Sequence, residues 1–422
     1  MKPTYHPRLS EREAWSTFNS SLKSYKALHR RGLDDLKQRG GVRTLTVLCA
    51  DRMCGGFGDQ LYRVHFFFLT ALMSNRVFTI YWDDFYRQST RHLEPNQINW
   101  DVANASSIGM CADGQLLCPH MKRYPSTSSF AWSRSKYEEF GEVLFGDEQH
   151  VIVHGNVFIN PMLICDESLM DTGRFINDGF EKIGVRAILA RGRDQQVYYT
   201  QSSLWYSVVL HLIGDMGRFT VEASDPWVQV NHAVFNYLFK FRGEILDHVN
   251  DVKKALGIDR QPYLALHLRT GFKGTPAEEK WNYLWSLRNW KLFEDESAWS
   301  CILRYCHRLA DNLIGPNTTI YLATDSTVTK EWAVRVYGNR TRTSPFVPFH
   351  SAGGSYNQDD KSVWVDFLIL SGGKVLVHGD SSYAINAAFV TPIPISRQSW
   401  TALSRKKGCL VSHIGNNVTC MC

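Results

Sequence analysis

The sequence lacks the patterns that define several common classes of site. Its 422 residues contain no CxxC pair among ten cysteines, no HExxH or comparable cluster among fifteen histidines, and no GxSxG motif. These absences argue against a zinc ribbon, a thioredoxin-like redox site, a histidine-based metal site and Ser-His-Asp catalysis. The acids at 83–84 and 359–360 are adjacent, without the DxD spacing of metal-dependent sugar transferases. We therefore predict no metal and no cofactor.

Basic residues are not concentrated in any one stretch. The net charge is +6, and the densest clusters, at 29–31 and 405–407, are short. A nucleic-acid-binding protein usually concentrates basic charge on one face, so we expect no nucleic-acid partner. The N-terminal residues contain neither a signal-peptide h-region nor a membrane-spanning segment. Either the protein is cytoplasmic or its membrane anchor is missing from this sequence, and we expect membrane association only in the second case.

The cysteines and the glycosylation acceptors indicate the cellular compartment of the protein. Cys111 with Cys118, and Cys409 with one of the tail cysteines, are plausible disulfides, and buried free thiols are an equal alternative. Asn-x-Ser/Thr acceptors occur at Asn19, Asn104, Asn317, Asn339 and Asn417. Together these features favour the Golgi or another secretory lumen.

Periodicity predicts an α/β protein that begins with a helical stem at residues 1–43. Hydrophobic residues at 44% and charged residues at 21% are typical of a soluble globular chain. Helical spacing over 9–39, with Ser10 as cap, predicts a helix that either packs on the main body or acts as a spacer. An N-terminal α/β domain follows at 44–258, with a polar insertion at 83–147. A strand at 44–50, a helix at 61–74 and a strand at 77–81 predict a βαβ unit there, with a strand at 157–159 and helices at 203–216 and 228–256.

A second α/β domain is predicted at 259–400, followed by a tail at 401–422. Strands at 263–268, 319–323 and 374–377 are each followed by a polar turn and a helix, and a further helix covers 361–371. In a parallel sheet of this kind ligand groups gather along one edge, beyond the carboxyl ends of the strands.

Several polar residues follow these strands. Arg269 comes directly after the strand at 263–268, where a guanidinium can bind a phosphate through two parallel hydrogen bonds. Asp325 ends the next strand and could bind a base or ribose, or instead cap the helix at 327–337. Ser381 and Ser382 could likewise cap the helix at 383–389 or contact a phosphate. Asp366 lies inside an apolar helix, where its charge needs a partner such as a ligand with two N–H donors.

A glycine-rich turn at 54–60 joins the first strand to its helix. Gly56 and Gly58, with Gly55, permit positive φ and close backbone approach, and a helix N-terminus favours an anion. The turn lacks the GKS or GKT ending of a P-loop. A tight structural turn is the alternative.

Four segments, taken in this order, resemble motifs of the fucosyltransferase superfamily of GT-B fold, which includes alpha-1,2-, alpha-1,6- and protein O-fucosyltransferases and the bacterial nodulation fucosyltransferase. The segments are GFGDQ at 56–60, HLRTG at 267–271, YLATDS at 321–326, and the stretch from Asp366 to Ser382. The resemblance covers residues 44–390. It implies two Rossmann-like domains facing a cleft, and inverting transfer of fucose from GDP-fucose, as donor substrate, to a glycan or glycoprotein acceptor.

The resemblance also implies roles for single residues. Arg269 would bind the β-phosphate and stabilise the leaving GDP. The other donor-binding residues would be Gly56, Gly58, His267, Asp325, Asp366, Ser381 and Ser382, with His267 and Asp366 on guanine.

The sequence departs from this pattern near the catalytic base. Thr270 stands where the alpha-1,6 enzymes have a second Arg, and Ala277 stands in register with their base. Glu278, next to it, and Asp59 in the first domain are the two candidate bases. A GT-B enzyme with another nucleotide-sugar donor, or a non-catalytic nucleotide- or glycan-binding module, remains an alternative.

Overall fold

The computed structural model describes residues 9–37, 42–49, 56–83, 87, 90–101, 121–124, 142–143, 145, 150–154, 179–189, 218–221, 224, 226–268, 296–348, 361–378 and 381–398. The chain divides into two compact units. Unit 1 comprises Met1–Val209 and Ser224–Lys240, and unit 2 comprises Leu210–Ala223 and Phe241–Cys422.

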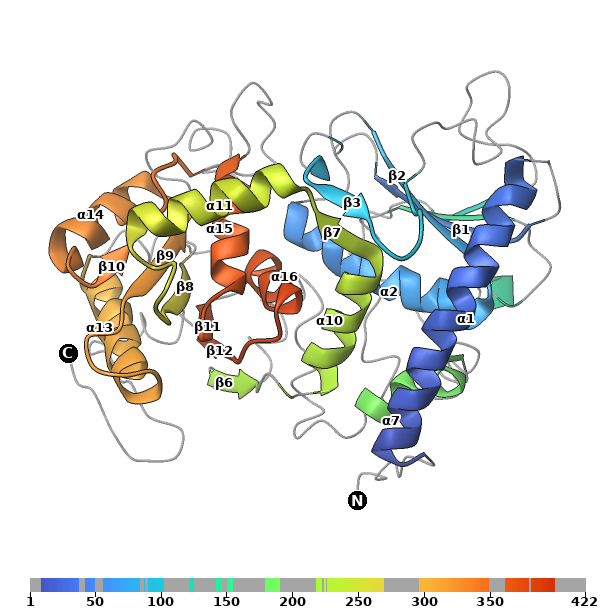
Figure 1. The fold of residues 1–422 in the computed structure, drawn as a ribbon, viewed down its shortest axis with the longest axis horizontal. Helices are drawn as coiled ribbons and strands as arrows, with labels where there is room; N and C mark the ends of the chain where they lie inside the picture. Colours follow the sequence, from blue (N-terminus) through green and yellow to red (C-terminus); the bar gives the residue numbers. More distant parts are fainter. Residues whose placement is uncertain are drawn as a thin grey trace. The chain divides into compact units, whose positions relative to one another are not determined.

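Unit 1 is built around a parallel four-stranded sheet (Figure 1). Its order is β2 (Val77–Trp82), β1 (Thr44–Cys49), β5 (His150–His154) and β4 (Met121–Tyr124), and every neighbouring pair is parallel. All six residues of β1 are buried, as expected for a central parallel strand covered on both faces. The helix α2 (Phe57–Ser74) connects β1 to β2, and the predicted βαβ unit is therefore present.

The predicted N-terminal helix is α1 (Glu11–Lys37), and it packs on unit 1. Ser10 and Glu13 form a reciprocal capping box, in which the Ser10 Oγ accepts from the Glu13 N–H and the Glu13 carboxylate accepts from the Ser10 N–H. Ala14, Phe18 and Leu22 lie on one face of the helix and are buried. Of the two expected arrangements, packing on the main body is therefore the one observed.

The outer edge of β2 is covered by side chains of α1. The Tyr25 hydroxyl donates to the Arg76 carbonyl at 2.5 Å and accepts from the Phe78 N–H at 2.9 Å. His29 Nε2 donates to the Phe78 carbonyl at 2.8 Å. Further along the same edge, the Ile80 N–H donates to the Trp100 carbonyl at 2.8 Å. Backbone groups at an exposed strand edge would otherwise be open to pairing with another chain, and here α1 and the Trp100 carbonyl occupy them.

Unit 2 is built around a six-stranded sheet. Its order is β10 (Thr341–Arg342), β9 (Ile320–Thr324), β8 (Leu264–Leu268), β11 (Val375–His378), β12 (Ile395–Gln398) and β6 (Arg218–Val221). Neighbours from β10 to β12 are parallel, and only β6 is antiparallel. The five parallel strands thus have the order 3-2-1-4-5 of a doubly wound nucleotide-binding fold.

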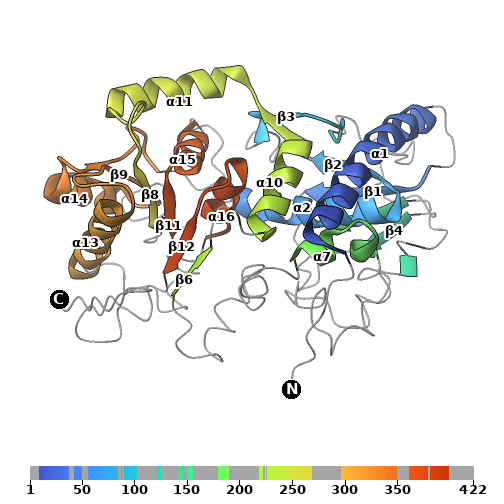
Figure 2. The same ribbon diagram turned by 60° about the horizontal axis from the view of Figure 1, so that its bottom comes forward.

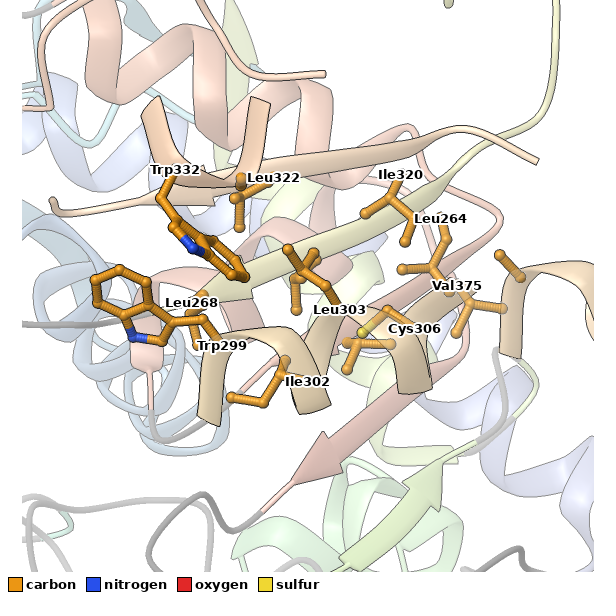
Figure 3. Packing of buried hydrophobic residues seen from close by; sticks show 14 residues of the cluster. Leu264, Leu268, Trp299, Ile302, Leu303, Cys306, Ile320, Leu322, Trp332 and Val375 are labelled. Carbon is orange, nitrogen blue, oxygen red and sulfur yellow. The ribbon is translucent and has the colours of Figure 1, made fainter. Parts of the chain in front are cut away.

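Helices cover both faces of this sheet (Figure 2). α13 (Glu296–Leu313) and α14 (Thr327–Tyr337) lie on one face, and α15 (Lys361–Ser371) and α16 (Ser382–Val390) lie on the other. Figure 3 shows the core between α13 and the sheet. Leu268 and Leu322 lie near the rings of Trp299 and Trp332, whereas Leu264 lies beside Ile320 and Val375 at the other end of the cluster. The predicted α/β fold with two parallel sheets is confirmed, and the cleft between the domains stays a prediction.

Some predicted elements differ from those observed. The single helix expected at 228–256 is two helices, α10 (Pro226–Leu238) and α11 (Gly243–Leu256), separated by β7 (Phe239–Phe241). The Phe-Lys-Phe sequence has aromatic residues that favour a strand, and β7 pairs with β3 (Leu93–Pro95) within the expected insertion. Most of the insertion, the segment 203–216, the strand at 157–159 and the tail 401–422 lie outside the described residues.

Cysteines of both expected kinds are present. Cys49, at the end of β1, is disulfide-bonded, whereas Cys306 on α13 is a buried free thiol. Cys111, Cys118 and Cys409 lie outside the described residues. Three glycosylation acceptors are described, at Asn19, Asn317 and Asn339, and all three are exposed. Among the helices described, none has the length and apolar character needed to cross a membrane.

Candidate functional site

The strand order of unit 2 places a topological switch point between β8 and β11. From β8 the chain continues to β9 and β10 on one side, and from β11 it continues to β12 on the other. In open α/β sheets ligands bind beyond the carboxyl ends of the strands at such a point. His267 and His378 are partners in register there. The sequence segments expected to bind the donor therefore follow the two strands that flank the switch point.

His267 lies on the face of the sheet that α16 covers. Its ring is 5.4 Å from the ring of Tyr383, a residue of α16. Leu266 and Leu268, its neighbours in the strand, belong to the core on the opposite face, as the alternation of side chains along a strand requires. His267 is 8% exposed. Its predicted contact with guanine stays a prediction.

The N-terminus of α16 follows β11. Ser381 is the N-cap, and its side chain accepts from the Ala384 N–H at 3.4 Å. Ser382 is the first residue of the helix. The capping role weighed for this serine pair is thus confirmed for Ser381, and the phosphate contact of both residues stays a prediction. A phosphate there would meet the positive end of the helix dipole.

Asp325 is the first residue beyond the carboxyl end of β9. The N-cap of α14 is Ser326, whose side chain accepts from the Thr329 N–H at 3.2 Å. The alternative prediction, that Asp325 caps the helix, is therefore wrong, because Ser326 has the extended backbone that a cap needs. Since β9 lies beside β8 in register, Asp325 shares the edge of the sheet with the switch point.

Asp366 lies on α15, and the protein itself supplies partners for its charge. The Tyr321 hydroxyl, from β9, donates to Asp366 Oδ1 at 2.5 Å. Burial raises the pKa of the Asp366 carboxyl, whereas the charge of Lys330 and hydrogen bonds from Tyr321 and Ser344 lower it. Asp366 is only partly buried, although its neighbours in α15, Val365 and Phe367, are buried completely. A carboxylate accepts about four hydrogen bonds, so it can also accept N–H donors of a ligand.

In unit 1 the glycine-rich segment is more regular than expected. Gly56 is the N-cap of α2, with an extended backbone at φ −74° and ψ 166°. Gly58 and Asp59 lie in the first turn of the helix, which begins at Phe57 rather than Leu61. The positive φ that glycine permits is therefore not used at Gly56 or Gly58. Gly58 is buried, and both glycines allow close backbone approach at the N-terminus of α2, so their donor contacts stay predictions.

Two predicted catalytic residues fall outside the described part of the chain. Arg269 is the first residue after β8, and Glu278 lies in the stretch that follows. Their roles, and that of Asp59, stay predictions. Within the described residues, no group of three or more His, Cys, Asp or Glu could hold a metal ion.

Sequence reasoning missed the side chains that surround Asp366. Tyr321 alternates with apolar residues in a strand, and Lys330 has the spacing of a surface residue on α14. Ser344 lies in a connection, and Tyr383 lies in the first turn of an apolar helix. No local pattern links these residues, which lie on four different segments and meet only in the tertiary structure.

Comparisons with known proteins bear on the fold. No known family profile and no curated protein matches the sequence. Among solved structures, the chain is similar to an Arabidopsis thaliana FUT1 mutant in complex with GDP, at 12% identity and a TM-score of 0.50, over 89% of this chain and 78% of that one. It also matches the fucosyltransferase NodZ from Bradyrhizobium at 12% identity and a TM-score of 0.41, over 82% of this chain and 92% of that one. The similarity to FUT1, together with the two parallel sheets, shows that the chain has a fucosyltransferase-like fold.

Proposed function

We propose that the protein is an inverting, metal-independent fucosyltransferase that moves fucose from GDP-fucose to a glycan or glycoprotein acceptor. The observation that carries the proposal is the switch point of unit 2, where β8, β9 and β11 end beside one another. The polar residues of the family-like motifs follow these three strands. The FUT1 structure of similar fold holds GDP, which supports a guanine nucleotide as ligand.

The proposed donor contacts follow from the chemistry of GDP. His267 and Asp366 would bind guanine, because a carboxylate accepts from the two N–H donors of that base. Ser381 and Ser382, at the N-terminus of α16, would contact phosphate. Asp325 would contact the nucleotide or order the site.

The proposed catalytic step is departure of GDP from the anomeric carbon. Negative charge develops on the β-phosphate in this step, and a fixed cation together with helix N-termini stabilises it without a metal. Arg269 is the proposed cation. The acceptor hydroxyl loses its proton to a carboxylate, for which Asp59 and Glu278 are the two candidates. Gly56 and Gly58 are further proposed donor contacts.

Nucleotide selectivity and donor hydrolysis test the proposal together. We expect GDP, and neither UDP nor ADP, to raise the melting temperature of the full chain. We also expect slow release of GDP from GDP-fucose, abolished in Arg269→Ala and retained in Arg260→Ala. Arg260 is a suitable control because it precedes the other end of β8 and its side chain is 94% exposed.

Each negative outcome identifies a different alternative. Stabilisation by UDP alone would indicate another nucleotide-sugar donor and would contradict the guanine role of Asp366. Stabilisation by GDP without hydrolysis, and without transfer to any acceptor on a glycan array, would indicate a non-catalytic binding module. Loss of activity in EDTA, restored by a divalent cation, would contradict metal independence.

A further inference from the structure

The cluster around Asp366 contains an ammonium group that no motif accounts for. Lys330 lies on α14, and its Nζ donates to the Ser344 hydroxyl at 3.4 Å and to the Phe346 carbonyl. Burial lowers the pKa of Lys330, whereas the charge of Asp366 raises it. A partly buried lysine held by two hydrogen bonds is not a solvated surface residue. The hydrogen bonds to Ser344 and Phe346 therefore fix the position of the Lys330 ammonium group.

Two hydroxyl groups of the cluster bond to the Asp366 carboxylate. Asp366 accepts from the Tyr321 hydroxyl, and Ser344 bonds to both the Asp366 carboxylate and the Tyr321 hydroxyl. Lys330 in turn donates to Ser344. Strand β9, helix α14 and the connection after β10 thus all contribute to the surroundings of a single side chain on α15.

We infer that Lys330 is a positioning residue, which keeps the Asp366 carboxylate ionised and oriented so that its remaining acceptor positions can receive the N–H donors of a guanine base. The inference rests on the proposed function for the identity of the ligand. An ionised carboxylate only accepts hydrogen bonds, whereas a protonated one also donates and cannot receive two N–H groups in the same way. The ammonium group is the one cationic side chain found to act on Asp366 within the described residues, and it opposes the effect of burial.

Other titratable groups lie on the elements that pack against α15. Tyr383 from α16 also interacts with Asp366, and its own pKa is raised by burial. On β8, His267 faces the Tyr383 ring. On α11, the His248 ring lies 5.4 Å from Phe346. Lys253, also on α11, lies near Gly372, beyond the C-terminal end of α15.

The pH dependence of GDP binding tests the inference. An opposite charge nearby changes a carboxyl pKa by about 1–3 units, so its removal should make Asp366 take up a proton at higher pH. We expect Lys330→Met to bind GDP about tenfold more weakly than wild type at pH 6 and about equally at pH 9. Lys330→Arg should restore binding at pH 6, and Lys254→Met, a change at a lysine that is 68% exposed, should have no effect. Equal weakening of Lys330→Met at every pH would indicate a structural role and overturn the inference.

A second measurement does not depend on GDP. The titration of the Asp366 carboxyl, followed by its infrared or carbon-13 NMR signal and assigned with Asp366→Asn, should move to higher pH in Lys330→Met. Ser344→Ala should give a smaller change in the same direction, and this variant serves if Lys330→Met does not fold. An unchanged titration overturns the role of Lys330. A shifted titration in a protein that does not bind GDP would instead refute the proposed function.

Discussion

Replacing Tyr25 by Phe should weaken the attachment of α1 to the sheet of unit 1. The phenol is 2% exposed, and its hydroxyl makes two hydrogen bonds at the edge of β2, with the Arg76 carbonyl and the Phe78 N–H. Burial raises the pKa of Tyr25 well above its ordinary value, so the hydroxyl is protonated and can donate and accept at once. Phenylalanine keeps the ring and its edge-to-face contact with Phe68 but removes both bonds.

The expected loss follows from the two backbone groups that remain. Each buried polar group left without a partner costs about 1–3 kcal/mol. The mutant also no longer buries a hydroxyl, which offsets part of that loss. We therefore expect the free energy of unfolding of unit 1 to fall by roughly 2–4 kcal/mol.

Amide hydrogen exchange measures this effect locally, which suits a chain with two units that need not unfold together. A loss of about 2 kcal/mol in the opening free energy should speed exchange at the Phe78 amide by about 30-fold. The Ile80 amide, bonded to the Trp100 carbonyl on the same edge, should change much less. Tyr81→Phe, at a partly exposed tyrosine of β2, is the matched control and should change stability by less than about 0.5 kcal/mol. Unchanged exchange at Phe78 in Tyr25→Phe would refute the assignment of that hydroxyl to the strand edge.

Two further predictions concern a buried histidine and two helix caps. Burial lowers the pKa of His65 to about 4, against an ordinary value of 6.5, so its contribution to stability is present above pH 6.5 and lost as the pH falls toward 4. The change in the free energy of unfolding between pH 7 and pH 5 should therefore be about 2 kcal/mol smaller in His65→Gln than in wild type. An equal change in the two proteins would contradict the lowered pKa of His65. Ser326→Ala and Ser381→Ala should each lower stability by about 1 kcal/mol through loss of a cap. Only Ser381→Ala should also weaken GDP binding, and equal weakening by both would show that the effect comes from loss of the cap.

The sequence alone was sufficient for the elements of unit 2 that carry the site. Short apolar runs with abrupt polar ends predict β8, β9 and β11 to within about a residue, and a charged residue within an apolar helix marks Asp366 as a side chain that needs a partner. These features are local, because strand and helix periodicity and capping depend on neighbours in the chain. The capping box of Ser10 and Glu13 is detectable for the same reason.

Local signals were less informative where the competing conformations differ little in energy. The segment 228–256 has helical spacing throughout, and β7 interrupts it because Phe239–Phe241 pairs with β3, far away in the sequence. Near Asp325 two adjacent residues can cap a helix, and the backbone conformation of the turn selects Ser326. The glycines at 56 and 58 permit positive φ, but the first turn of α2 does not use it.

The sequence by itself determined the α/β class, the strands that end in polar residues and the identity of the residues that could bind an anion. Only the tertiary structure decided which of these strands are neighbours, since strand order depends on crossover connections that leave no local pattern. It places β8 beside β11 and so creates the switch point. It also decided the surroundings of Asp366, because the groups that lower its pKa, Lys330, Tyr321 and Ser344, come from separate segments. Burial and charge depend on what surrounds a side chain in space, and the chain near a residue specifies only part of those surroundings.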